Sequence, residues 1–237
     1  MVLIHGFLGG ARQWSEVVNA FSNQRPVITI DLPGFADAAA EKPATTINEF
    51  SHYVLAELDA RRLQSVAVLG HSMGGMIAQE MACQRPDLID RLVLYGTGPL
   101  GQMPDRFESI ERSLERLEQQ GLSETARTVV ASWFVDGRHS AGFESLEEIA
   151  TQASPDAARK ALLAMAAWDG RNNLAQIEVP TLVLWGDQDR SYRWPQVESL
   201  WQGLPRANLA VVPGASHATH VEKPGIFVPI LQDFLAS

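Results

Sequence analysis

Apolar residues along this chain follow two patterns. Short runs rich in Val, Ile and Leu are typical of buried strands, and longer stretches with an apolar residue every three or four positions are typical of helices with one buried face. The short runs predict strands over residues 2–4, 27–30, 66–70, 92–95, 181–185 and 209–212. Helical spacing fills most of the intervals between them. This alternation predicts an α/β fold with a mostly parallel sheet that is flanked by helices and joined by right-handed crossovers.

The alternation stops after the fourth expected strand. From there to about residue 176 the sequence contains no strand pattern, and helical patterns are separated by breaks at Gly121 and at Asp136-Gly137. The expected helices of this block cover residues 107–119, 123–133, 146–152 and 155–168. We therefore expect a helical insertion between two strands of one sheet. The expected division is a core over residues 1–96 and 180–237 and an insertion over residues 97–179.

Composition restricts the class of protein. Of the 237 residues, 46% are hydrophobic and 20% are charged, as in an ordinary soluble globular protein. A formal net charge of −9, without a Lys/Arg run, argues against a nucleic-acid partner. We expect a cytoplasmic protein, because no apolar stretch reaches membrane-spanning length and no signal peptide is visible. The single cysteine, Cys83, fits a reducing compartment and is expected to be buried. The alternating Glu and Arg residues from Glu108 to Glu118 are expected to form a solvated helix face.

The segment around Ser72 carries the first chemical signal. The strand before it ends at Gly70 and helical spacing begins just after it, so strand and helix must meet in a very sharp turn. Such a turn leaves no room for side chains two positions to either side of Ser72, where the sequence has Gly70 and Gly74. A serine held in this way stands at a helix N-terminus beside the N–H of Met73, as a nucleophile would. The alternative is a glycine-rich turn in which Ser72 only caps the helix.

A serine nucleophile needs a base that takes its proton and a third group that orients the base. Both should follow strands that end near Ser72. The last two expected strands are followed by such residues, which are Asp187 and Asp189 after the first and His217 and His220 after the second. A glycine-rich loop, His5-Gly6-Phe7, also follows the first strand. Its backbone could approach a reacting oxygen, and His5 is expected to brace the loop by hydrogen bonds.

Taken together, these motifs resemble those of the α/β-hydrolase family over nearly the whole chain outside the insertion. The matching segments are His5-Gly6-Phe7 with Trp14, Asp31-Leu32-Pro33-Gly34, Gly70-His71-Ser72-Met73-Gly74-Gly75, Trp185-Gly186-Asp187-Gln188-Asp189, and Gly214-Ala215-Ser216-His217 with Glu222-Lys223-Pro224. The resemblance implies that Ser72 is the nucleophile, Asp189 the acid and His217 the base. It also implies an oxyanion hole made by the N–H groups of Phe7 and Met73, with neither a metal nor a cofactor.

The chain departs from the family pattern in two places. Two further strands usually precede the His-Gly loop, and they are missing here. After the Asp31–Gly34 segment the family usually has another glycine and then serine, whereas this chain has Phe35-Ala36. The shape of this loop, which forms one wall of the pocket in the family, is therefore expected to differ.

The insertion resembles the helical cap of the family, which normally covers the site and selects the substrate. The residues considered for its pocket are Trp133, Phe134, Trp168, Arg106 and Arg171, each of which could equally pack in the core of the cap. The motif context is most similar to the group that includes 3-oxoadipate enol-lactonases and carboxylesterases. It implies hydrolysis of a small-molecule ester or lactone.

Three other functions remain open on the same framework. One is a carbon–carbon bond hydrolase, although such enzymes commonly carry an aromatic residue directly after the catalytic histidine, where this chain has Ala218. The second is a lyase similar to the menaquinone-pathway synthase. The third is a receptor that only binds a ligand in the capped pocket. Serine, rather than a carboxylate residue, in the sharp turn at position 72 argues against dehalogenases and epoxide hydrolases of this family, since both need a carboxylate nucleophile. The sequence leaves the oligomeric state open.

Overall fold

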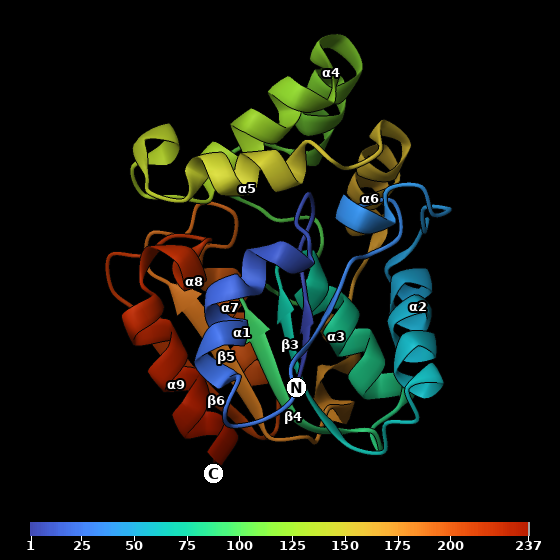
Figure 1. The fold of residues 1–237 in the computed structure, drawn as a ribbon, viewed down its shortest axis with the longest axis vertical. Helices are drawn as coiled ribbons and strands as arrows, with labels where there is room; N and C mark the ends of the chain where they lie inside the picture. Colours follow the sequence, from blue (N-terminus) through green and yellow to red (C-terminus); the bar gives the residue numbers. More distant parts are fainter. Residues whose placement is uncertain (237) are drawn as a thin grey trace.

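A computed structural model describes residues 1–236 of the protein (Figure 1). Its centre is a parallel sheet of six strands in the order β2-β1-β3-β4-β5-β6, counted over the described residues. The strands are β1 (Val2–Ile4), β2 (Ile28–Ile30), β3 (Val66–His71), β4 (Ile89–Tyr95), β5 (Thr181–Gly186) and β6 (Ala207–Val212). All the predicted strands are present. β4 and β6 begin two or more residues earlier than the apolar runs indicate. In β4 the polar residues Asp90 and Arg91 separate the buried Ile89 from the apolar run, and β6 begins with the half-buried Ala207 and the exposed Asn208.

Helices cover both faces of the sheet, as the alternation predicts. Leu3, Leu69 and Val93 pack on the face covered by α1 (Ser15–Phe21) and α9 (Pro224–Ala236). The neighbouring residues in each strand point to the other face, against α2 (Ile47–Ala60), α3 (Met73–Gln84) and α7 (Trp194–Gly203). β1, β3 and β5 are buried along their whole length, which requires near-continuous apolar residues on both faces of these strands. None of the helices within residues 1–236 is long and apolar enough to cross a bilayer.

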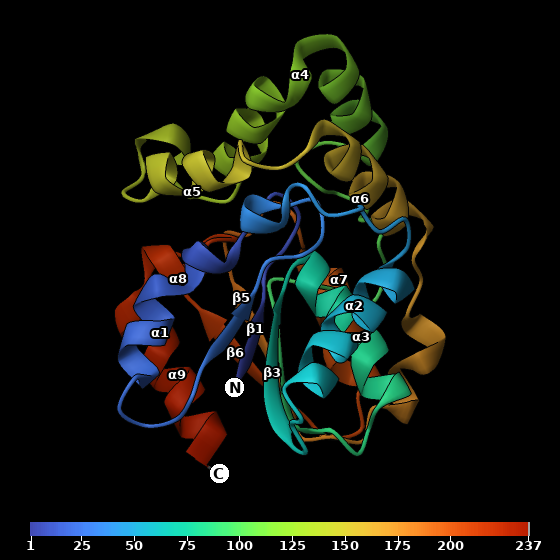
Figure 2. The ribbon, with the colours of Figure 1, turned by 45° about the vertical axis from the view of Figure 1, so that its right-hand side comes forward.

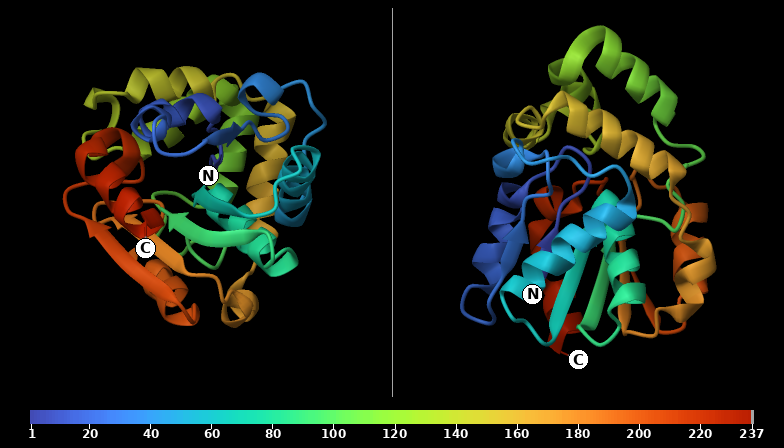
Figure 3. Two further views of the ribbon diagram at one scale, coloured as in Figure 1. Left: turned by 60° about the horizontal axis from the view of Figure 1, so that its bottom comes forward. Right: turned by 90° about the vertical axis from the view of Figure 1, so that its right-hand side faces the viewer.

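The segment between β4 and β5 is helical and lies over the carboxyl ends of the strands (Figures 1 and 2). It contains α4 (Ile110–Ser132), α5 (Phe143–Ala150) and α6 (Pro155–Ala167). The side chain of Ser109 accepts a hydrogen bond from the N–H of Arg112 and so starts α4. Gly121, with φ 80° and ψ 179°, breaks that helix where the sequence predicts a break between two helices. The views in Figure 3 show the same block above one end of the sheet.

One expectation for this block is wrong in part. Glu108 and Arg116 form an ion pair of 2.7 Å, and their side chains are only 10% and 15% exposed. Glu108 precedes α4 and folds back under it, so this end of the charged run is enclosed rather than solvated.

Shorter helices complete the chain, namely α8 (Thr219–Glu222) and the 3-10 turns Ala11–Trp14, Ala36–Ala38, Gly137–His139 and Arg171–Gln176.

Candidate active site

Ser72 sits in a strained turn between β3 and α3. Its φ of 56° and ψ of −119° lie outside the regions that serine normally adopts. A Cβ added at Gly70 would come within 2.2 Å of the Gly74 carbonyl oxygen, and one at Gly74 within 2.4 Å of the Ile4 carbonyl oxygen. The sharp turn and the need for both glycines are therefore confirmed. The Ser72 carbonyl accepts a hydrogen bond of 2.8 Å from Thr97 Oγ1, which helps to hold the strained residue in place.

Two backbone N–H groups without acceptors flank Ser72. The loop after β1 passes so close that a Cβ on Gly6 would lie 2.7 Å from the Ser72 Cβ. Neither the N–H of Phe7 nor that of Met73, the first residue of α3, donates to any acceptor within the described residues. Free N–H groups at a helix N-terminus favour a negative charge beside them.

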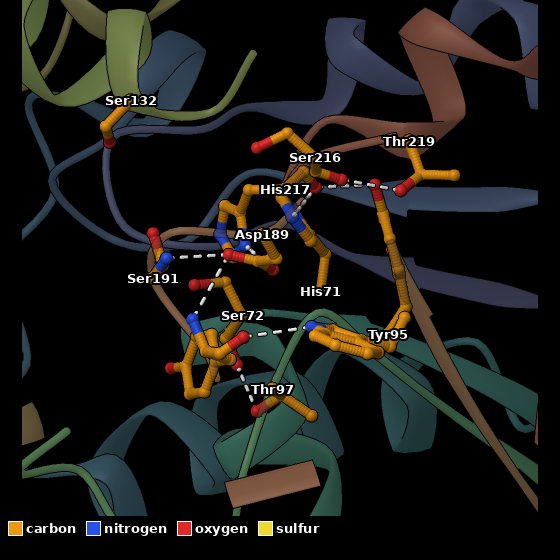
Figure 4. Close-up of polar contacts among 12 residues, drawn as sticks. His71, Ser72, Tyr95, Thr97, Ser132, Asp189, Ser191, Ser216, His217 and Thr219 are labelled. Carbon is orange, nitrogen blue, oxygen red and sulfur yellow. Dashed lines mark hydrogen bonds and ion pairs between the residues drawn. The ribbon is translucent and has the colours of Figure 1, made fainter. Parts of the chain in front are cut away.

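His217 and Asp189 form a fully buried pair. His217 Nδ1 lies 2.8 Å from Asp189 Oδ2, and the side chains are 2% and 0% exposed (Figure 4). The second carboxylate oxygen of Asp189 accepts hydrogen bonds from the N–H groups of Ser191, at 2.7 Å, and Tyr192, at 3.1 Å. Asp187 instead accepts the N–H of Gly214 at the surface and does not touch His217. Of the two aspartates in this turn, the structure brings only Asp189 to the histidine.

Ser72 and His217 line the same cavity. Ser72 Oγ and His217 form no hydrogen bond with each other in the part of the chain that the structure describes. Such contacts are often loose without substrate, and rotation about the Cα–Cβ bond of Ser72 changes the direction of its hydroxyl.

The backbone of His217 is fixed from two strands. Its carbonyl oxygen accepts a hydrogen bond of 2.6 Å from the Tyr95 hydroxyl and one of 3.1 Å from His71 Nε2. Glu222 holds the same loop through Ser216, whose N–H donates to Glu222 Oε2 at 2.6 Å. The other Glu222 oxygen accepts the N–H of Val135 at 2.7 Å, which ties the histidine loop to the residues after α4.

The histidines around His217 are buried and neutral. Burial, together with the nearby His217, lowers the pKa of His71 well below its ordinary value and lowers the pKa of His220 to about 3. His220 packs on Trp14 and meets the Tyr95 hydroxyl through Nδ1 at 3.1 Å. His5 accepts the N–H of Leu32 through Nε2 at 2.9 Å and donates to the Gly6 carbonyl through Nδ1, so it braces the loop as expected.

The cavity beside Ser72 is narrow, with a volume of about 20 Å³. Trp133 and Arg106, two of the residues considered for a pocket, line this cavity. The remaining lining residues are Phe7, Met103, Val129, Met165, Ser191 and Tyr192. Of these, only Phe7 could be named from the sequence. Tyr192, three residues after Asp189, stacks on the His217 ring with a centroid distance of 5.8 Å, and no sequence motif marks it.

The other residues considered for the pocket lie elsewhere. Trp168 donates from Nε1 to Glu80 at 2.8 Å and packs against α3 rather than lining the cavity. Arg171 pairs with Asp169 at 2.6 Å on the surface and is 56% exposed. Phe134 is fully buried and packs edge-on against Phe143 in the helical block. Aromatic residues in the insertion therefore divide between pocket and packing, which helical spacing alone does not distinguish.

A metal site is not built into this region. Within residues 1–236 no group of three His, Cys, Asp or Glu side chains could hold a metal ion.

Comparison with known proteins identifies relatives along the whole chain. The family model described as "alpha/beta hydrolase fold" matches residues 1–224. A protein named as a carbamate hydrolase, RutD of Pseudomonas savastanoi pv. phaseolicola, is 25% identical over 99% of this chain and 93% of its own length. The 2-succinyl-6-hydroxy-2,4-cyclohexadiene-1-carboxylate synthase of Serratia proteamaculans is 27% identical over 100% of this chain and 93% of its own length. The crystal structure of the enol-lactonase from Burkholderia xenovorans LB400 superposes with a TM-score of 0.91 at 24% identity, covering 100% of this chain and 90% of that one.

Proposed function

This chain belongs to the α/β-hydrolase fold family, and we propose that it is a serine hydrolase that cleaves a small carboxylic ester or lactone. Ser72 is the nucleophile, His217 the general base and Asp189 the group that orients His217. The observation that carries the proposal is the His217–Asp189 pair of 2.8 Å in one cavity with a serine in a strained turn. The two N–H groups without acceptors beside Ser72 supply the remaining element of acyl-transfer chemistry.

In the first step Ser72 Oγ attacks the carbonyl carbon of the ester while its proton passes to His217 Nε2. Asp189 accepts the Nδ1–H of His217, which leaves Nε2 free to take the proton and stabilises the imidazolium that forms. The carbonyl oxygen becomes an oxyanion, held by the N–H groups of Phe7 and Met73. When the carbon–oxygen bond of the ester breaks, His217 returns the proton to the leaving alkoxide. A water molecule then repeats the sequence on the acyl-enzyme and releases the acid.

We place the helical block over residues 97–179 in this proposal as the cap that limits which acyl group reaches Ser72. Trp133 and Arg106 are its contributions to the substrate pocket.

A cytoplasmic location belongs to the same proposal. Cys83 is free and half-buried, and burial raises the pKa of its thiol to about 11, so it stays unreactive at neutral pH.

The direct test combines turnover with labelling. A panel of p-nitrophenyl esters should give sustained turnover, and a serine-reactive fluorophosphonate should abolish it with a mass increase on the peptide that contains Ser72. Ser72→Ala should lower kcat by about 10⁴-fold or more without loss of fold, while Ser199→Ala, at an exposed serine of α7, should match the wild type. Labelling at another residue, or a single slow acylation without turnover, would contradict the proposal. The latter result would favour a ligand-binding receptor.

The names of the relatives define a second candidate. One relative is named as a carbamate hydrolase and another as a synthase, so relatives of this chain are not all named for ester cleavage. The same assay therefore includes a carbamate, since both candidates share Ser72 and differ only in which substrate turns over faster.

A further inference from the structure

The cavity beside Ser72 contains a buried hydroxyl that the proposed hydrolysis does not use. Tyr192 is 1% exposed, and its hydroxyl faces the side chains of Ser72 and Thr97 without making a close hydrogen bond to any group within residues 1–236. Its position is fixed at the backbone, where the N–H donates to Asp189 and the carbonyl accepts from Trp185 Nε1 at 2.9 Å. The ring stacks on His217 with an angle of 16° between the planes. A buried polar group is normally paired, so an unpaired hydroxyl in the wall of a substrate cavity points to a ligand.

A cation lines the same cavity. The Arg106 guanidinium donates from Nη1 to the Glu108 carbonyl at 2.9 Å and to Ser113 Oγ at 3.1 Å, and it lies 4.4 Å from the centre of the Phe107 ring. Its Nε and Nη2 donate to no acceptor in the described part of the chain. These contacts fix one edge of the guanidinium and leave the rest of the planar group available.

The carboxylate nearest to Arg106 is already occupied. Glu108 is paired with Arg116 at 2.7 Å and also accepts the Ser113 hydroxyl at 2.6 Å. Arg106 itself forms no ion pair with any residue from 1 to 236. Arg106, Glu108 and Arg116 together therefore have a net charge of +1 beside the cavity. A largely buried cation without a partner favours an anion of the opposite charge, because low dielectric strengthens the attraction.

We propose that the substrate carries a carboxylate, which Arg106 and Tyr192 bind beside Ser72. The inference rests on the proposed hydrolysis and names the substrate class for it, an ester or lactone whose acyl or alcohol part ends in a carboxylate. A guanidinium fork matches a carboxylate, and the phenol donates to one of its oxygens. Burial raises the pKa of Tyr192, so the phenol stays protonated and remains a donor at neutral pH. One net positive charge balances a carboxylate but leaves a phosphomonoester half neutralised.

The route to the cavity agrees with this role. Arg106 and Met103 line both the cavity and the surface groove formed by residues 100–111. An anion that enters from solvent along this groove meets Arg106 before it meets Ser72. The apolar side chains of Val129, Trp133 and Met165 line the rest of the cavity wall, which matches the hydrocarbon segment between a carboxylate and an ester in chemical character.

The test compares matched esters on wild-type enzyme and variants. Monoethyl glutarate and ethyl 5-oxohexanoate differ only in a carboxylate replaced by a methyl ketone, and 4-acetoxybutanoate with 5-acetoxypentan-2-one places the same difference on the alcohol side. We expect kcat/KM at least tenfold higher for the carboxylate in one of the two pairs. Arg106→Gln should abolish that preference through KM. Tyr192→Phe should reduce the preference for the carboxylate ester about fivefold. Arg112→Gln, at an exposed arginine of α4, should leave this preference unchanged.

A binding measurement keeps the inference separate from the proposed hydrolysis. Calorimetry with glutarate on Ser72→Ala should show binding that is lost in Ser72→Ala/Arg106→Gln, whichever bond the enzyme cleaves. If Arg106→Gln does not fold, Arg106→Lys should keep part of the preference because it retains the charge without the fork. Neutral esters turned over as fast as carboxylates, with no glutarate binding, would overturn the inference and leave the hydrolase proposal intact. If the wild type bound glutarate but showed no Ser72-dependent turnover of any ester, the hydrolase proposal would fail and the carboxylate site would stand.

Discussion

The Tyr95 hydroxyl donates a hydrogen bond of 2.6 Å to the backbone carbonyl of His217. Tyr95 ends β4 and stacks on His71, which ends β3 and donates to the same carbonyl. Two central strands of the sheet thus position the loop that carries the candidate base. The hydroxyl also accepts the N–H of His220 at 3.2 Å, so a single oxygen connects two parts of this loop to the sheet.

Removal of that oxygen should impair catalysis more than folding. Tyr95→Phe keeps the ring and its stacking, and it leaves the His217 carbonyl with one donor and the His220 N–H without its acceptor. We expect a fall in kcat of about tenfold with little change in KM, and a loss of about 1–2 kcal/mol in the free energy of unfolding. Steady-state kinetics and urea unfolding measure both effects. Tyr53→Phe, at a half-buried tyrosine on α2, is the control. An unchanged kcat would show that His71 alone suffices to hold the loop.

The two aspartates after β5 should differ strongly in effect. Asp189→Asn removes the carboxylate that orients His217 and should lower kcat by about 10³- to 10⁴-fold. Asp187→Asn retains an oxygen that can accept the Gly214 N–H at the surface, so its activity should stay within about threefold of wild type. Kinetics on any ester that turns over can measure the ratio. The opposite ranking would mean that the acid is misassigned.

The loop beside Ser72 offers a test of the oxyanion proposal. A Cβ at Gly6 would lie 2.7 Å from Ser72 Cβ and 3.0 Å from the His71 carbonyl oxygen, so Gly6→Ala must displace the Phe7 N–H from Ser72. We expect kcat to fall by 10²-fold or more, a loss typical of one missing oxyanion donor. Gly225→Ala is the matched control, because a Cβ there meets nothing within 4 Å. Equal activity in the two variants would exclude Phe7 from the oxyanion site.

The sequence predicts most of the framework because strong local constraints produce it. The strands are apolar on both faces, and the turn at Ser72 tolerates only glycine at positions 70 and 74, so short-range patterns suffice. The cavity wall is different. Tyr192, Met103 and Met165 come from three separate segments, and only the folded chain brings them together. Trp133 and Trp168 show the same limit. Both lie in apolar helical contexts, yet one faces Ser72 and the other binds Glu80.

The same reasoning explains why Glu108 was expected to be solvated. Alternating Glu and Arg residues are usually exposed, and nothing in their spacing shows that Arg116 folds over Glu108. That enclosed pair leaves Arg106 as the uncompensated cation of the cavity. The feature that favours an anionic substrate is therefore invisible in the sequence.

The buried histidines predict how stability depends on pH. Burial lowers the pKa values of His5, His71 and His220 in the folded protein, whereas each titrates near 6.5 in the unfolded chain. Below pH 6.5 the unfolded state binds protons that the folded state does not, so the free energy of unfolding must fall as pH falls. Above pH 6.5 both states are neutral at these positions and the contribution is complete. For His220 the loss continues down to about pH 3.

Each such histidine contributes a slope of about 1.4 kcal/mol per pH unit below pH 6.5. Urea unfolding between pH 7.5 and 5.5 should therefore show a plateau that turns into a steep decline, before most carboxyl groups begin to titrate. His220→Gln removes one titrating group, so its decline should be shallower by about 1.4 kcal/mol per pH unit, whatever its stability at pH 7.5. His52→Gln, at an exposed histidine of α2, should keep the wild-type slope. If His220→Gln and wild type declined in parallel, His220 would take up its proton at the same pH in the folded and unfolded states, and burial would not lower its pKa.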